Sequence, residues 1–478
     1  MNIDTKQPGG DSFRGVPQGT VDHVGRDVRV RQHIIDTIQA VYESFGFSPY
    51  ETPLLENFEV VQGRYGESEG SIFHVVDKQK HHMALRFDST VSLARLVATH
   101  PKLPRPFRAY NFGKSFRDDT NGLECRELAL CSADVIGSDS LGCDAEFIVL
   151  AYHVLKKLGF ADFTIRINHR KIYQDIVEMH GVRDSDQIAV IQQVIDHFDK
   201  GKQDMAGVKE ELAKLGIESE IIDVLLEVLD LCGSPYYVLR QLEEMVYSRT
   251  KGVGFRGLNE LKEIVTALPR EVIDKTEIDM SLVQNFRYYT GSVIECSIAN
   301  VSAGPVLRGG RYDDLISSFG AGVAAVGSAF YIEPIQEAMD CLGISDKLNV
   351  SRRRIFLTCT DSGQLSKLIL ISQALRANSL EVVTAYVPIS NKFLRLKMAM
   401  DEQCSFIVIL DGILRIKPLP GYGNGVLAGV LEDALSNNAY GDRGVSAVIV
   451  EEEVSQNDLE GVASMSRPSL TFNPFKEM

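Results

Sequence analysis

Strand-like segments fall into two groups along the chain, and a long helical stretch lies between them. The first group comprises Ser71–Val76, His82–Arg86, Arg108–Phe116 and Leu128–Ile136; the second lies near residues 277–299 and 323–333. Short polar turns between strands are typical of an antiparallel sheet with helices against it. Residues 170–275 carry helical patterns instead, as in Ile221–Leu231. This order predicts an α+β fold in which a helical insertion separates the two halves of one core.

Two further regions flank these groups. Apolar residues recur at three- and four-residue spacing from Arg26 to Phe45, which predicts a helix that Gly46 ends. Phe47–Tyr50 follows as a predicted strand. From Arg353 the segments alternate as strand, helix, strand, helix and strand up to Leu410. Such a βαβαβ order implies a small C-terminal α/β domain with a partly parallel sheet.

The bulk composition excludes several classes of protein. A length of 478 residues predicts roughly two to four domains. No apolar run approaches the ~20 residues that span a bilayer, and no signal peptide is visible, so we expect no membrane partner. The eight cysteines are scattered singly, which argues against a metal site and favours reduced thiols in the cytoplasm. A net charge of −15 argues against general attraction to nucleic acid.

Two short segments carry the most specific signal. Residues 279–291 read Asp-Met-Ser-Leu-Val-Gln-Asn-Phe-Arg-Tyr-Tyr-Thr-Gly, and residues 309–313 read Gly-Gly-Arg-Tyr-Asp. They resemble the two histidine-recognition boxes of the histidyl-tRNA synthetase family, a class II aminoacyl-tRNA synthetase family. The family's first box reads Val-Arg-Gly-Leu-Asp-Tyr-Tyr-Thr-Gly, and its arginine takes part in the chemistry. Gln284 stands at that position, and its neutral amide cannot stabilise developing negative charge as a guanidinium does.

The resemblance implies an amino-acid pocket. Leu85–Thr90 resembles the family's Leu-Arg-Tyr-Asp-Leu-Thr box, in which the carboxylate and hydroxyl hold the α-ammonium of histidine; Asp88 and Thr90 keep both groups. Tyr288 and Tyr289 correspond to the pair that lines the imidazole pocket. Because alternate strand residues face opposite ways, we expect only one of them to face the ligand. A salt bridge, a strand hydroxyl and ordinary aromatic packing are the structural alternatives for these residues.

The second box adds Gly309, Gly310 and Arg311, whose glycines let backbone approach closely. The family's second class II motif is matched by Phe116–Asp119 and Arg126–Asp134. Arg117 aligns with the arginine that grips the α-phosphate, and Asp134 retains a carboxylate for the amino acid. Leu130 replaces a glutamine that hydrogen-bonds the substrate. Glu124 stands where a basic residue is usual.

The third motif departs furthest from the family. The family reads Val-Gly-Phe-Ser-Ile-Gly-Val-Glu-Arg, whereas residues 326–334 read Val-Gly-Ser-Ala-Phe-Tyr-Ile-Glu-Pro. Pro334 replaces the arginine that binds adenine and the terminal phosphate, and Tyr331 replaces a glycine that makes room for adenine. Losing one group that stabilises developing charge costs ~10²–10³ in rate, so the losses at 284 and 334 imply ~10⁴ or more. No catalytic residue is therefore assigned.

Three functions remain open. The first is a degenerate paralogue that binds a histidine-like amino acid and acts as a regulatory or accessory subunit. It resembles the regulatory subunit of ATP phosphoribosyltransferase, although that subunit lacks the insertion and the C-terminal domain. The second is an active histidine–tRNA ligase, or another amino-acid-activating enzyme in which Arg287 or Arg308 replaces the lost charge. Only this enzyme requires ATP and Mg as cofactors. The third is an RNA-binding pseudo-synthetase that uses residues 353–410, where no basic stripe with interleaved aromatics occurs.

The resemblance also implies a domain order and partners. Residues 1–169 would form the first half of the synthetase-like core, 170–275 the helical insertion and 276–345 the second half. Residues 353–478 would form an anticodon-binding-like domain that diverges after 412. We expect a homodimer that pairs through the helix and strand at 26–53. A phosphoribosyltransferase is a candidate protein partner, and tRNA is not favoured.

Overall fold

A computed structural model describes residues 15–118, 125–182, 184–199, 204–250, 255–284, 288–320, 322–348, 354–377, 380–402, 404–411, 413–419, 448–450 and 454–463. Glu124, Arg287 and residues 420–447 lie outside these ranges. The chain divides into two compact units, Met1–Leu348 and Asn349–Met478. None of the helices within the described residues is long and apolar enough to cross a membrane.

A large sheet organises the first unit. Its described strands follow the order β1-β5-β6-β12-β11-β10-β7-β9-β8. Their bounds are β1 Ser48–Pro49, β5 Phe107–Phe116, β6 Glu127–Ile136, β7 Phe163–His169, β8 Cys232–Gly233, β9 Thr276–Asp279, β10 Ser292–Ile298, β11 Leu307–Arg311 and β12 Ala325–Tyr331. All neighbouring pairs are antiparallel except β1 with β5 and β7 with β9. The predicted α+β fold, a largely antiparallel sheet flanked by helices, is therefore confirmed.

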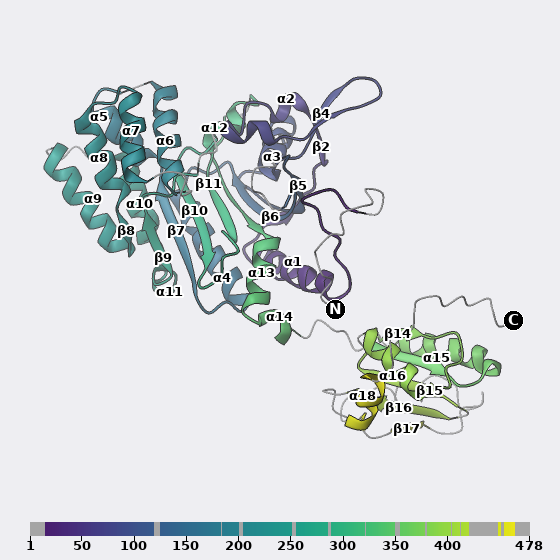
Figure 1. Ribbon diagram of the computed structural model, residues 1–478. Helices are drawn as coiled ribbons and strands as arrows, with labels where there is room; N and C mark the ends of the chain where they lie inside the picture. Colours follow the sequence, from purple (N-terminus) through teal and green to yellow (C-terminus); the bar gives the residue numbers. More distant parts are fainter. Residues whose placement is uncertain are drawn as a thin grey trace. The chain divides into compact units, whose positions relative to one another are not determined.

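Helices cover both faces of this sheet (Figure 1). On one face α1 (Arg26–Ser44) packs with α4 (Leu141–Lys157) and α13 (Ile332–Cys341), and α14 (Ile344–Lys347) follows. The predicted stripe of α1 is buried there, including Val30, Ile34, Ile38 and Val41. On the other face lie α3 (Ser89–Thr99) and α12 (Asp313–Ser317). Their core includes Tyr65, Phe87 and Val91.

A smaller sheet and the helices predicted for residues 170–275 complete the first unit. The smaller sheet has the order β2 (Leu55–Asn57), β4 (His82–Leu85) and β3 (His74–Val76), with α2 (Phe58–Val61) and a 3₁₀ turn at Gly66–Ser71 beside it. Between β7 and β9 the described elements are almost all helices. They are α5 Lys171–Met179, α6 Ser185–Asp199, α7 Met205–Lys214, α8 Ser219–Leu229, α9 Pro235–Thr250, α10 Arg256–Thr266 and α11 Arg270–Ile273.

The second unit contains the predicted alternation of strands and helices. Its described sheet has the order β14 (Glu381–Thr384), β13 (Arg354–Cys359), β15 (Phe406–Leu410), β16 (Leu414–Pro418) and β17 (Val448–Val450). The first three strands are parallel, whereas β16 is antiparallel to β15. The helices are α15 (Leu365–Ala377), α16 (Lys392–Asp401) and α18 (Gln456–Ala463). A partly parallel sheet was expected from the βαβαβ order.

Candidate amino-acid-binding site

A cavity opens on the α3 side of the large sheet. Counting its open mouth, the empty space is about 480 Å³. Side chains from the start of α3, the end of β5, the segment before β10 and strands β6, β11 and β12 surround it. They are Asp88, Ser89, Thr90, Arg117, Leu130, Ser132, Tyr288, Tyr289, Arg308, Tyr312, Gly327, Ser328, Ala329 and Tyr331. Seven of the residues that the boxes and motifs singled out therefore meet here, whereas six others that the structure describes do not line the cavity: Asp134, Gln284, Gly309, Gly310, Arg311 and Pro334.

Strand register arranges the floor of this cavity in rows. Arg308 pairs with Ala329, which pairs with Ser132; two residues further along, Gly310 pairs with Gly327, which pairs with Asp134. Tyr331 pairs with Leu130 in the row on the opposite side. Because alternate residues of a strand share a face, these three rows lie side by side on the floor. The floor thus runs from the small residues Gly327, Ala329 and Ser132 to Leu130 and Tyr331, and Asp134 lies beside Gly327 without lining the cavity.

Asp88 is a buried carboxylate with several donors around it. Its Oδ1 accepts from the backbone N–H of Val91 at 3.0 Å, which makes Asp88 the N-cap of α3. The hydroxyls of Tyr288 and Tyr65 donate to it at 3.2 and 3.4 Å. Burial raises the pKa of Asp88, although these donors oppose the shift. Thr90 lies in the first turn of α3, so neither residue belongs to a strand.

Asp134 is a second buried carboxylate. The hydroxyl of Tyr312 donates to its Oδ1 at 2.6 Å. A Cβ at Gly327 would overlap that oxygen, so glycine is required beside it. Burial raises the pKa of Asp134 to about 7, and the charge of Asp88 adds to the shift. No donor from the described residues reaches its Oδ2. Tyr65 and Tyr312 were given no role from the sequence: nothing there distinguishes Tyr65 from a core aromatic, whereas Tyr312 lies within the second box.

Tyr288 and Tyr289 both line the cavity, so the prediction that only one faces it is wrong. The physical reason is local: β10 begins at Ser292, and the two tyrosines precede it in a segment without strand alternation. Their rings meet edge to face with centroids 4.9 Å apart. A Cβ at Gly310 would lie 3.0 Å from the ring of Tyr289. The second glycine of the box therefore makes room for that ring.

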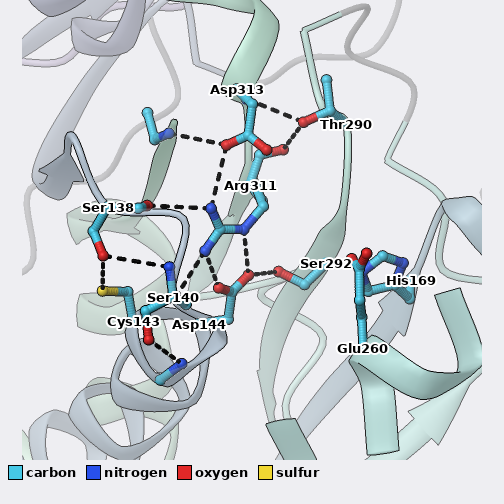
Figure 2. A network of polar contacts seen from close by, with 12 residues as sticks. Ser138, Ser140, Cys143, Asp144, His169, Glu260, Thr290, Ser292, Arg311 and Asp313 are labelled. Atoms are coloured by element: carbon cyan, nitrogen blue, oxygen red, sulfur yellow. Dashed lines mark hydrogen bonds and ion pairs between the residues drawn. The ribbon is translucent and has the colours of Figure 1, made fainter. Parts of the chain in front are cut away.

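Arg311 does not line the cavity but lies in a polar network with Asp144 and Asp313 (Figure 2). Its guanidinium bonds both carboxylate oxygens of Asp144, in the first turn of α4, and reaches Asp313 at 3.2 Å. Asp144 also accepts a hydrogen bond from Ser292. The carbonyl of Arg311 accepts the N–H of Thr290 at 2.8 Å. Arg311 thus ties the tyrosine segment to α4, which is a positioning role.

Two other guanidiniums do line the cavity. Arg117 lies at the end of β5 with its guanidinium carbon 4.6 Å from the centre of the Phe87 ring. Arg308 projects from β11, and its Nε donates to Glu295 at 2.9 Å. Glu295 was not assigned from the sequence. Its place opposite Arg308 follows from the pairing of β10 with β11, which the sequence alone does not fix.

Comparison with known proteins identifies the family to which the chain belongs. A family profile for histidyl-tRNA synthetase matches residues 19–335. A histidine–tRNA ligase of Gloeobacter violaceus is 33% identical over 380 residues, which are 73% of this chain and 80% of that relative. A histidine–tRNA ligase of Cytophaga hutchinsonii is 30% identical over 424 residues, or 83% and 92%. The chain belongs to the histidyl-tRNA synthetase family.

Solved structures agree with this placement. The histidyl-tRNA synthetase from Nostoc superposes with a TM-score of 0.74 at 26% identity, covering 89% of this chain and 99% of that one. An ATP phosphoribosyltransferase regulatory subunit/histidyl-tRNA synthetase from Bacillus halodurans gives a TM-score of 0.69 at 22% identity, covering 84% and 99%. The second likeness shows a shared fold. The suspected family and its class II architecture are therefore confirmed.

Gln284 is buried and is not among the residues that line the cavity. Its Nε2 donates to the carbonyl of Ile294 at 2.8 Å, and its backbone has a φ of 48°, unusual for a residue other than glycine. Its carbonyl accepts from Arg170, which also binds Gln192 of α6. The amide side chain at the position of the family's arginine is thus engaged with the sheet. Arg287, the suggested substitute, lies outside the described residues.

Of the other altered motif positions that the structure describes, two line the cavity and one lies in α13. Leu130 and Tyr331 pair across β6 and β12 and both line it. Pro334 occupies the first turn of α13, where its missing N–H breaks no helical hydrogen bond. Its neighbour Glu333 accepts from Arg31 at 2.6 Å and from the N–H of Ala129. Within the described ranges, no group of three or more His, Cys, Asp or Glu side chains is placed to hold a metal.

Proposed function

We propose that this member of the histidyl-tRNA synthetase family binds a histidine-like amino acid in the cavity without activating it. One observation supports this most: the cavity is lined by the carboxylate of Asp88 and, at the altered motif positions, by Leu130 and Tyr331. Asp88 and Asp134 suit the cationic groups of an amino acid. Tyr331 stands where the family's glycine makes room for adenine and Leu130 where its glutamine hydrogen-bonds the substrate, and neither side chain offers a cationic group.

The retained residues have defined roles in this proposal. Asp88 and Thr90 hold the α-ammonium, and the hydroxyl of Tyr288 fixes the carboxylate of Asp88. Tyr289 covers the ligand's side chain, and Asp134 accepts a hydrogen bond from it. Arg117 faces an anionic group of the ligand rather than the phosphate of ATP. Gly309, Gly310 and Arg311 shape and support the pocket wall.

The decisive experiment combines two measurements on one sample. Calorimetric titration with L-histidine is expected to show binding, and ATP–pyrophosphate exchange with histidine and the other amino acids is expected to show none. Absence of binding at millimolar histidine would overturn the proposal. Exchange with any amino acid would overturn its non-catalytic part.

An active histidine–tRNA ligase is the second candidate. It is favoured by the relatives themselves, since the two compared above bear that name and align over most of their length. ATP and Mg would then be substrate and cofactor, and tRNA the partner. The pyrophosphate exchange distinguishes the two candidates directly, because only the ligase forms an adenylate.

The proposed biological setting is a regulatory or accessory subunit in the cytoplasm. A homodimer through α1 and β1 would expose one cavity per subunit, and light scattering of the purified chain would give its mass. A phosphoribosyltransferase is one candidate partner for such a subunit. Co-purification with a catalytic phosphoribosyltransferase whose rate responds to histidine would support this setting.

A further inference from the structure

The cavity contains an arginine that none of the synthetase motifs assigns to a ligand. Arg308 lies on β11 between Glu295 of β10 and Ala329 of β12. It shares the floor of the cavity with Ala329 and Ser132, whose side chains are short. Arg308 therefore adds a positive charge on the cavity side of the sheet.

A row of alternating charges holds Arg308 in place. Glu295 is 4% exposed and binds two arginines, Nε of Arg308 at 2.9 Å and Nη1 of Arg166 at 2.8 Å. Arg166 in turn pairs with Asp279 at 2.7 Å. A buried carboxylate that grips the Nε edge restricts the rotamers of the arginine. This restraint lowers the entropy that the side chain loses when it binds a ligand.

Charges of both signs lie at the cavity. Arg117, Arg308 and Asp88 line it, and the carboxylates of Glu295, the partner of Arg308, and of Asp134 adjoin it. Such an arrangement is complementary to a zwitterion. Guanidiniums bind carboxylates through paired, charge-assisted hydrogen bonds, which an ester, an amide or a decarboxylated amine cannot offer.

We infer that Arg308, together with Arg117, binds the α-carboxylate of a free amino acid, and that the cavity selects the free acid over its carboxylate-lacking analogues. This inference rests on the function proposed above, because it assigns the ligand of the same cavity. Arg308 lines the cavity, whereas Gln284, whose Nε2 donates to the carbonyl of Ile294, does not.

The test compares L-histidine with histamine, its decarboxylated analogue, by calorimetric titration of the full-length chain and of Arg308→Ala. Charge-assisted hydrogen bonds predict that the variant binds histidine about 10- to 100-fold more weakly and that histamine affinity is unchanged. Arg308→Lys is expected to restore part of the loss, since it keeps the charge without the fork. Glu295 keeps its bond to Arg166 in these variants, so the sheet retains a partner for it.

A matched control removes another arginine of the same unit. Arg256 bonds the buried carboxylate of Asp175 at 3.0 Å and does not line the cavity, so Arg256→Ala should bind histidine as the parent does. Failure of the parent to bind histidine would refute the proposed function itself. Equal affinity of the parent for histidine and histamine, or equal histidine affinity of the parent and Arg308→Ala, would refute the inference alone. A thermal melt of each variant shows whether a loss reflects unfolding.

Discussion

At the scale of single residues, Asp134 couples the stability of the first unit to pH. Burial raises the pKa of Asp134 to about 7, above the ~3.9 of an unfolded aspartate. The folded chain therefore binds the proton more tightly than the unfolded chain does. The resulting contribution to the free energy of unfolding is fully present below pH ~3.9 and is lost as the pH rises through about 7. Its size is about 1.4 kcal/mol for each pH unit between the folded and the unfolded pKa.

Asp134→Asn should remove this dependence. We expect the variant to gain stability relative to the parent between pH 5 and pH 8, because its amide does not ionise. Its oxygen can still accept from Tyr312. Chemical denaturation at both pH values measures the change, with Asp340→Asn, an exposed aspartate of α13, as control. If the free energy of unfolding changes equally with pH in Asp134→Asn and in the parent, Asp134 is not the group that couples stability to pH.

The pair of Arg311 and Asp144 is another residue-scale feature, with side chains 3% and 2% exposed. Removing one partner of a buried pair leaves the other charge without compensation and costs about 3–5 kcal/mol. We expect Arg311→Met to lower the free energy of unfolding of the first unit by that order.

A double-mutant cycle gives the measurement. The double variant Asp144→Leu/Arg311→Met lacks both charges. Its free energy of unfolding should therefore fall by much less than the sum of the decreases in the two single variants. Urea denaturation of the four proteins supplies the values. Additive losses would show that the pair does not act as a unit, and the support role of Arg311 would then need another cause.

At the scale of elements, the floor of the cavity depends on the strand register of β11 and β12. Gly310 allows the ring of Tyr289 to rest on the sheet. In Gly310→Ala the new methyl group would lie 3.0 Å from that ring and 2.5 Å from the carbonyl oxygen of Ser292. Overpacking of this kind costs about 1–3 kcal/mol and displaces the ring.

Histidine titration and thermal melts test this expectation. Gly310→Ala should weaken histidine binding more than it lowers the melting temperature, since Tyr289 covers the ligand. Gly70→Ala is the control, because a Cβ there meets no atom within 4 Å. If Gly310→Ala binds histidine as the parent does, Tyr289 does not contribute to the pocket.

The sequence predicted the elements better than it predicted side-chain directions. The helix from Arg26, strands β5 and β6 and helix α15 were expected from periodicity, which burial on one face produces directly. The strand β11 was not expected, since its glycine pair lacks strand propensity. Nor could the sequence show that Arg311 points away from the cavity while Arg308 lines it. That difference depends on register between strands far apart in the chain.

Several motif residues lie together where backbone geometry fixes them. Asp88, Thr90, Tyr288 and Arg117 all line one cavity. The interpretation failed where it assumed a strand: the tyrosine pair precedes β10 and does not alternate. Gln284 illustrates a further limit, because its buried amide bonds Ile294 in a left-handed backbone conformation that no local pattern announces.

At the scale of the whole molecule, the residues that line the cavity all belong to the unit Met1–Leu348. The second unit has its own sheet and its own apolar clusters. A chain ending at Leu348 should therefore bind histidine within about two-fold of the full-length affinity. The same truncation should abolish RNA binding if that function resides in the second unit.

Titrations of the full-length chain and of the chain ending at Leu348, with histidine and with a tRNA transcript, test both expectations. The RNA titrations are made at two salt concentrations. Far-ultraviolet circular dichroism of the shorter chain serves as the folding control. A folded 1–348 chain that loses histidine affinity would mean that the second unit contributes to the ligand site, against the division into independent units. Salt-sensitive tRNA binding that survives truncation would move RNA recognition to the first unit. It would also favour the ligase over the accessory subunit, because the synthetase-like core would then bind two of the three substrates of aminoacylation, the amino acid and the tRNA.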